Sequence, residues 1–314
     1  MEDQIEITPD VQAVADVLRL DAVETAIFAS QLEHVKAKSF DVLYPAFKAR
    51  QFVPVSHECD PADQTVTYYQ WDSFGAAKAI SNYGMDLPNV DVAGKEFSAK
   101  IKEIGASYTY TVNDVRVALK TGTSLDQKRA AAARRAIEAG IDDTLAWGLP
   151  EFGMPGLLNH PNVSTVTLPT GTWSSASAEN ILKDLNYMVQ TIIVATKQVH
   201  TPDTLILDTV SFARLSQTVA GNQLNDTIMG IFLKTNPYIK NIDQWVKLDT
   251  ASAAGGPMIL CYLRNPDVAE AEIPVEFEQH PLQPRNLEFV TNCTARVSGV
   301  QIRYPNALCY ATNM

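Results

Sequence analysis

Residues 124–163 read SLDQKRAAAARRAIEAGIDDTLAWGLPEFGMPGLLNHPNV, and this stretch decides the fold. Ser124 and Gln127 have the spacing of a helix capping box, which predicts a helix over 125–148. Small and apolar residues recur on one stripe of that helix: Ala130, Ala133, Ile137, Ile141, Leu145 and Gly148. Charged residues lie mostly opposite: Lys128, Arg129, Arg135, Glu138, Asp142 and Asp143. An alanine-rich stripe lets a long helix lie close against a sheet, so we expect this helix to be the spine of a domain.

An apolar elbow follows the helix. Gly148 and Pro150 predict the helix end, because glycine favours the position just past a helix and proline the positions beyond. Residues 152–163, FGMPGLLNHPNV, then combine prolines that stiffen the chain with glycines that permit sharp turns. We therefore expect a fixed change of direction here.

The composition predicts a folded protein with a large core. The chain has 314 residues, of which 46% are hydrophobic, which allows one large domain or two medium ones. No apolar run is long enough to cross a bilayer, and the acidic start MEDQIEITPD does not resemble a signal peptide. We therefore expect synthesis in the cytosol and no association with a membrane.

The charge pattern argues against tight binding of nucleic acid. The formal net charge is -11, and the sequence has no cluster of five or more Lys or Arg residues. Proteins that hold nucleic acid tightly need such clusters to displace counterions. An acidic wall would suit a container that encloses DNA without recognising its sequence, although many acidic soluble proteins have the same charge.

The candidate reactive residues do not form a known catalytic or metal-binding motif. The cysteines Cys59, Cys261, Cys293 and Cys309 lack CxxC spacing and are expected to be buried free thiols. A turn carries His57, Cys59, Asp60 and Asp63, but its mixed ligand types and its proline favour a solvated loop over a metal site. The sequence also has no G-x-S-x-G, Walker or H-E-x-x-H motif.

Two further groups of residues could in principle form a catalytic pair. His160 could activate Cys293 or Cys309, and Asp142 with Asp143 could form a carboxylate pair. Adjacent helix residues point to different faces, so we expect that the two carboxylates cannot share a substrate. The prediction is that the chain has no catalytic, cofactor-binding or metal site, and that it needs no cofactor.

Hydrophobic periodicity predicts the remaining helices and strands. The helices are expected from Thr8 through 35, at 113–120, from Ser177, at 210–218 and at 226–236. Strands are expected at 52–55, 65–71, 105–112, 204–208, 245–248 and 258–263. Between these, Gly75, Gly84, Gly94 and Pro88 should break 51–104 into short pieces. The strands 275–278, 287–290, 294–297, 300–303 and 307–310 should form one antiparallel sheet under the spine helix.

Three motifs, in this order along the chain, give the sequence a family resemblance. They are 82–92 NYGMDLPNVDV, 153–163 GMPGLLNHPNV and 293–305 CTARVSGVQIRYP. The sequence resembles tailed-phage major capsid proteins of the Hong Kong 97 type and the related encapsulin shell proteins. The resemblance implies an α+β fold with an N-terminal arm (1–50), an extended β-hairpin loop reaching over an adjacent subunit (51–104), a peripheral domain with the spine helix (105–165 and 270–314) and an inserted axial α/β domain (166–269).

The same resemblance implies a structural role. The subunit would self-assemble into hexamers and pentamers of an icosahedral shell that encloses the double-stranded DNA of a tailed phage. It would not be an enzyme, would be assembled in the host cytoplasm and would end in the virion capsid. Portal, scaffold and cement proteins are implied partners. Two alternatives stay open at this point: an encapsulin-like compartment that encloses a cargo enzyme, and an unrelated cytosolic α/β enzyme.

Overall fold

The computed structural model describes residues 44–79, 87–121, 125–217, 226–286 and 288–312. The chain divides into the units Met1–Ala46 and Phe47–Met314, and the fold described below is that of the second unit. The helices expected before residue 36 and the cap at Ser124 lie outside the described residues. Within the described ranges, no helix is both long enough and apolar enough to cross a membrane.

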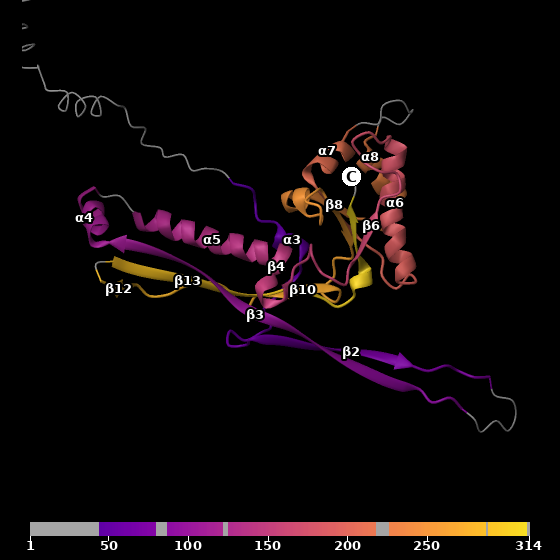
Figure 1. The fold of residues 1–314 in the computed structure, drawn as a ribbon, viewed down its shortest axis with the longest axis horizontal. Coiled ribbons are helices and arrows are strands. Elements are labelled where there is room, and N and C mark those ends of the chain that lie inside the picture. The colour runs from indigo at the N-terminus through magenta and orange to yellow at the C-terminus, as the bar shows by residue number, and fades with distance from the viewer. Residues whose placement is uncertain (1–43, 80–86, 122–124, 218–225, 287, 313–314) are drawn as a thin grey trace, which may run out of the picture. The chain divides into compact units, whose positions relative to one another are not determined.

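The spine helix packs on a long antiparallel sheet, as the sequence predicts. Helix α5 (Leu125–Trp147) lies along β3 (Asp91–Thr111) and β13 (Glu288–Ser298), as Figure 1 shows. The sheet has the order β11 (Val275–Gln279), β13, β3, β2 (Thr65–Phe74), and β12 (Gln283–Arg285) also pairs with β13. Helix α4 (Val112–Thr121) joins β3 to the spine. The buried members of the stripe are Ala133, Ile137, Ile141, Leu145 and Gly148. The predicted packing of the spine is therefore confirmed.

Strand β3 is a single strand with two different partners. Its inner half pairs with β13, from Thr111 opposite Glu288 to Ile101 opposite Ser298. Its outer half pairs with β2 and forms a hairpin. The expectation that glycines would break this region into short pieces was wrong at Gly94, which pairs with Trp71 inside the ladder. A Cβ at Gly94 would lie 2.8 Å from Trp71 Cζ3, so this glycine makes room for the indole.

A second sheet is covered by helices. Its order is β6 (Ser164–Thr167), β15 (Leu308–Thr312), β9 (Ile259–Tyr262), β7 (Thr204–Leu207) and β8 (Asn241–Gln244). The helices are α6 (Ala178–Ala195), α7 (Thr209–Leu215) and α8 (Ile228–Thr235). Each begins after a side-chain cap: Ser177, Asp208 and Thr227 accept the N–H of the residue three positions on. The helices expected from Ser177 and within 210–218 and 226–236 are therefore present.

The predicted C-terminal sheet was wrong at its last two strands. The strand expected at 300–303 is β14 (Gln301–Ile302), which pairs with β10 (Ala269–Glu272) in a separate three-stranded sheet. Residues 307–310 were expected under the spine, but β15 lies between β6 and β9 of the second sheet. Both faces of β15 are buried, with Tyr310 in one apolar cluster and Cys309 in the other. A strand that is apolar on both sides needs a sheet covered on both sides. Under the spine, the strands expected at 287–290 and 294–297 are parts of the single strand β13.

Other boundaries also differ from the prediction. Residues expected to form a strand at 245–248 form a 3-10 turn, η2 (Val246–Thr250), because the Leu248 N–H bonds to Trp245 O. The strand lies earlier, at β8. The strand expected at 52–55 is helix α3 (Ala49–Phe52) followed by β1 (Val55–Ser56). The sequence analysis also missed β6 and β10 (Ala269–Glu272), and β10 lies between β1 and β14 (Gln301–Ile302).

The elbow folds back on the end of the spine helix. Gly148 has φ +71°, and β4 (Gly148–Leu149) pairs with β5 (Met154–Pro155) around the turn η1 (Pro150–Phe152). The N–H groups of Leu157 and Leu158 donate to carbonyls of the last helical turn. The Asn159 amide accepts from the Gly156 N–H and donates to Trp147 O at 2.6 Å. The GLLN segment therefore satisfies helix-end carbonyls that would otherwise lack partners.

Candidate assembly interface

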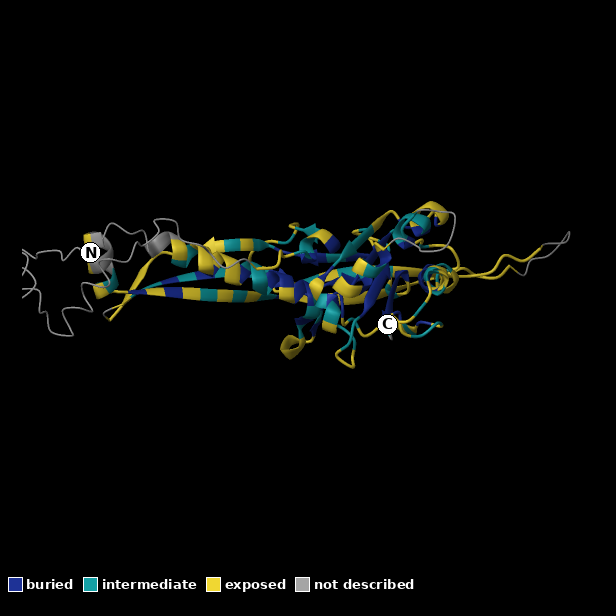
Figure 2. Ribbon diagram, turned by 90° about the horizontal axis from the view of Figure 1, so that it is seen from above, coloured by how far each residue is buried: buried dark blue, intermediate teal, exposed yellow. Residues whose placement is uncertain are grey.

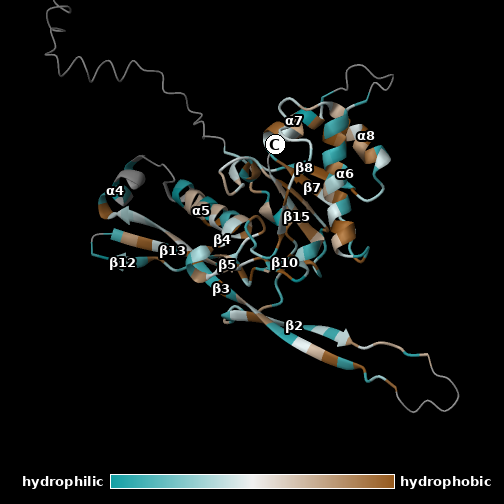
Figure 3. Cartoon of the chain, turned by 45° about the vertical axis from the view of Figure 1, so that its right-hand side comes forward, coloured by the Kyte–Doolittle hydropathy of each residue, from teal (hydrophilic) through white to brown (hydrophobic). Residues whose placement is uncertain are grey.

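The outer part of the β2–β3 hairpin exposes large apolar side chains. Cross-strand pairing places Tyr69 opposite Glu96, Trp71 opposite Gly94 and Ser73 opposite Val92, so these residues share one face of the ribbon. Trp71 is 69% exposed and Tyr69 64% exposed. We call the surface formed by Tyr69, Trp71 and Val92 the outer hairpin face. Exposed colour dominates this ribbon in Figure 2, and apolar bands recur along it in Figure 3.

In the described ranges, no hydrophobic core covers this face. A two-stranded ribbon is marginal in water, and a contiguous exposed apolar patch marks an interaction surface. Further along the described part of the ribbon, Phe74 and Val90 are also largely exposed. The arrangement therefore presents apolar area to a partner.

The base of the hairpin, by contrast, is attached to the rest of its unit. Arg296 Nη2 donates to Asp63 O at 2.6 Å, and Lys100 Nζ donates to Phe152 O at 3.0 Å. The Tyr68 and Phe97 rings stack with centroids 5.3 Å apart, and the Arg303 guanidinium lies 5.4 Å from the centre of the Tyr68 ring. These contacts hold the base in place, so we expect an order that depends on assembly only in the outer part of the hairpin, beyond Tyr68.

The carboxylates of the spine have a structural use that the sequence analysis did not anticipate. Asp142 was placed opposite the buried stripe, but it is only 5% exposed. Its Oδ1 accepts the Ala49 N–H at 2.7 Å, and its Oδ2 lies 2.5 Å from Lys247 Nζ. The same ammonium lies 2.7 Å from Asp143 Oδ1. The long lysine side chain reaches both carboxylates and is their shared ion-pair partner. The expectation that the two carboxylates cannot share a substrate stays a prediction.

The candidate ligands of the 57–63 turn are engaged in local contacts. His57 Nδ1 lies 2.7 Å from Ile273 O, Asp60 accepts the Ala62 N–H, and Asp63 accepts the Asp60 N–H. Burial, with help from the nearby Glu272 carboxylate, raises the pKa of Cys59 to about 11. Among the described residues, no three His, Cys, Asp or Glu side chains are grouped so that they could hold a metal ion.

The structure does not bring His160 together with Cys309. The His160 N–H points to the Tyr310 hydroxyl, 3.3 Å away, whereas Cys309 lies on the other face of β15, in the cluster that includes Cys261. Burial raises the pKa of Cys309 to about 12 and lowers the pKa of His160. Burial also raises the pKa of Cys293. These thiols stay protonated near neutral pH, which makes them poor nucleophiles.

Comparison with solved structures identifies the fold. The capsid of Myoviridae phage XM1 superposes with a TM-score of 0.81 at 15% identity, covering 91% of this chain and 98% of that one. A chain from Mycobacterium phage Adephagia gives 0.63 at 11% identity, covering 91% and 96%. The virus-like particle from Pyrococcus furiosus gives 0.56 at 14% identity, covering 83% and 91%. These likenesses show that the α+β architecture is that of phage capsid subunits.

The sequence itself identifies the family. A search of curated proteins gave no match. Residues 75–314, which include β3, the spine helix, the elbow and the second sheet but not β2, match the family described as Major capsid protein. The match covers most of the chain and agrees with the fold and with the exposed hairpin. The chain therefore belongs to the major capsid protein family, and its role is that of a structural capsid subunit.

Proposed function

We propose that this subunit assembles with copies of itself into hexamers and pentamers of an icosahedral shell that encloses the double-stranded DNA of a tailed phage. Assembly takes place in the host cytoplasm, and the subunit has no catalytic activity. Portal, scaffold and cement proteins are its further partners. The proposed organisation is an arm (1–50), an intersubunit loop (51–104), a peripheral domain (105–165 and 270–314) and an axial domain (166–269). Within 270–314, β15 is the exception, because it pairs with β6 and β9 and so completes the sheet of the axial domain.

The outer hairpin face is the observation that carries the proposal. Tyr69 and Trp71 are mostly exposed although the base of the same ribbon is well attached. In a monomeric protein an ordered ribbon would leave these aromatic side chains in contact with water. In a shell, a neighbouring subunit covers them. Each subunit makes several such contacts, so modest interfaces add up to a stable particle.

Electron microscopy of the purified chain tests assembly directly, and the expected result is closed shells or capsomers. Hydrogen exchange should then be compared between dissociated capsomers and intact shells. Amides of 69–74 and 91–96 should exchange quickly in the capsomer and slowly in the shell. Amides on α6 in the core serve as the internal control with equal protection in both states. A strictly monomeric protein at high concentration would contradict the proposal.

A compartment that holds a protein cargo is the second candidate, because the fold also resembles the Pyrococcus furiosus virus-like particle. That likeness has the lower TM-score, 0.56 against 0.81 for the phage XM1 capsid. Shells purified from the natural source should contain DNA that resists added nuclease. Shells that contain a co-purifying enzyme and no DNA would favour the compartment.

A further inference from the structure

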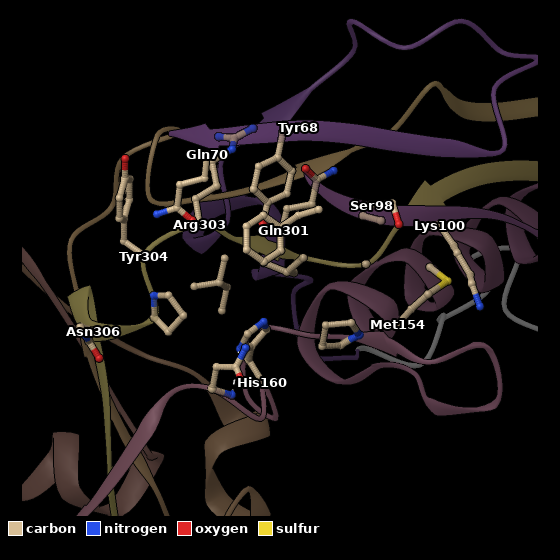
Figure 4. Close-up of a pocket in the computed structure, with 18 of the residues that line it drawn as sticks. Tyr68, Gln70, Ser98, Lys100, Met154, His160, Gln301, Arg303, Tyr304 and Asn306 are labelled. Atoms are coloured by element: carbon tan, nitrogen blue, oxygen red, sulfur yellow. Dashed lines mark hydrogen bonds between the residues drawn. The ribbon is translucent and has the colours of Figure 1, made fainter. Parts of the chain in front are cut away.

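A cleft lies where the hairpin base, the elbow and the segment 299–306 meet. Its volume is about 620 Å³, within the range of ligand-binding pockets. Figure 4 shows Tyr68, Gln70 and Ser98 of the hairpin on one wall and His160 of the elbow on the other. Tyr304 borders the cleft on a third side.

The cleft contains a buried amide without a partner. Gln301 lines it and is only 4% exposed, yet among the described residues neither its Nε2 nor its Oε1 has a hydrogen-bond partner. An unsatisfied buried polar group is costly, so native structures rarely leave both ends of an amide unpaired. A primary amide offers one acceptor and two donors, which match the N–H and C=O of an incoming peptide backbone.

The charge of the cleft favours an incoming peptide that carries a carboxylate. Lys100 and Arg303 line the cleft, and in the part of the chain that the structure describes no Asp or Glu does, although the whole chain has a net charge of -11. Arg303 is paired with Glu270 at 2.7 Å, whereas Lys100 bonds only to the Phe152 carbonyl among the described residues. Burial lowers the pKa of His160, so its ring is neutral near pH 7. The Lys100 ammonium is therefore the cation that can attract an incoming carboxylate.

The chain itself carries a segment of matching chemistry. On the hairpin face opposite Trp71, Phe74 is 54% exposed. Exposed carboxylates flank it: Asp72 two residues earlier on the same strand, and Asp91 directly across the ladder. Strand β2 is also the edge of its sheet within the described residues, so its outward peptide groups lack ladder partners.

We propose that the cleft receives this segment from a second copy of the chain. Phe74 enters between the apolar walls, Gln301 bonds to the peptide backbone of the incoming β2 edge, and Lys100 pairs with Asp72 or Asp91. This inference rests on the proposed function and adds the receiving site and the inserted residue. Charge complementarity and the unpaired Gln301 amide carry it.

Replacing the amide by an apolar side chain of similar shape tests the role of Gln301. Gln301→Met should leave the urea midpoint of the dissociated subunit unchanged or raise it, because the variant removes an unsatisfied polar group. It should also raise the protein concentration needed for half-assembly about tenfold, which corresponds to about 1.4 kcal/mol. Gln283→Met, at an exposed position of β12, is the matched control and should change neither quantity. Unchanged assembly of Gln301→Met, or a lowered midpoint, would overturn the assignment.

A crosslink identifies the occupant. A photoreactive phenylalanine analogue at Tyr304 places the probe beside the cleft, and mixing isotopically heavy and light subunits distinguishes contacts between copies. In assembled shells, the crosslinked peptide should contain residues 69–79 or 87–96 of another copy. A crosslink to a different segment, or to a separate protein, sinks this inference while the shell function stands. If the unmodified chain forms no shells at all, the proposed function fails instead.

Discussion

Lys247 Nζ lies 2.5 Å from Asp142 Oδ2, so a single ammonium joins η2 to the spine helix. The other oxygen of the same carboxylate accepts the Ala49 N–H at 2.7 Å, at the start of α3. Three segments distant in sequence therefore meet at one buried carboxylate. Such a group is tolerated only while its partners remain, because an unpaired buried charge is strongly unfavourable.

Removing the ammonium should destabilise the subunit. Lys247→Met leaves Asp142 buried beside Asp143 without a cation, and we expect the free energy of unfolding to fall by about 1–3 kcal/mol. Urea denaturation of dissociated subunits measures this. Lys240→Met, at an exposed lysine, should change it by less than about 0.5 kcal/mol. Equal stabilities for the two variants would show that the bridge contributes nothing.

The elbow glycines should differ sharply in their tolerance of alanine. Gly148 and Gly153 both have positive φ, +71° and +69°. A Cβ at Gly148 would lie 2.0 Å from Met154 O, whereas at Gly153 it would meet nothing within 4 Å. Gly153→Ala should therefore cost only the left-handed backbone penalty of about 1–2 kcal/mol. Gly148→Ala should abolish soluble expression, and equal melting temperatures for the pair would contradict the elbow geometry.

The spine stripe should tolerate truncation poorly. Ile141 is fully buried against the sheet, so Ile141→Ala should lower the free energy of unfolding by about 2–4 kcal/mol. Ala136→Ser, on the exposed side of the same helix, should cost less than about 0.5 kcal/mol. Chemical denaturation of both variants checks this, and a small loss at Ile141 would mean that the helix packs loosely.

The buried thiol Cys309 should make the subunit sensitive to alkali. Its folded pKa is about 12, against an ordinary value of 9.0. The unfolded state therefore loses its proton first, so the stability contributed by this group is present below pH 9 and is lost as the pH rises toward 12. Cys309→Ala should flatten the decline in unfolding free energy between pH 9 and 11 by up to about 1.4 kcal/mol per pH unit. An identical pH slope in the variant would show that the thiol is not buried in solution.

The elements with strong local signals could be predicted from the sequence. The spine helix, the capped helices after Ser177, Asp208 and Thr227, and strand β9 follow from periodicity and capping residues that lie within a few positions of one another. The fold class followed from three motifs that occur together in the sequence. The structure explains the role of the motif 153–163, because its Asn159 donates to a carbonyl at the end of the spine helix.

What could not be predicted depends on contacts between distant segments. Asp142 looked solvent-facing because its partners, Ala49 and Lys247, come from segments far away in the sequence. Gly94 looked like a strand breaker because the indole that occupies its space lies on the other strand. The cleft could not be predicted for the same reason. The sequence around Gln301 does not show that its amide is buried without a partner among the described residues.

Strand β3 runs without interruption from Asp91 to Thr111, which at about 3.3 Å per residue is a rod of about 70 Å. Its outer half is bonded to β2 and its inner half to β13, in ladders whose hydrogen bonds lie across the strand. A pull on the outer hairpin therefore acts along the strand and loads many of these bonds in parallel. In the proposed filled shell, tension on one subunit's ribbon would therefore pass through this rod to the sheet beneath the spine helix, where many bonds would share the load.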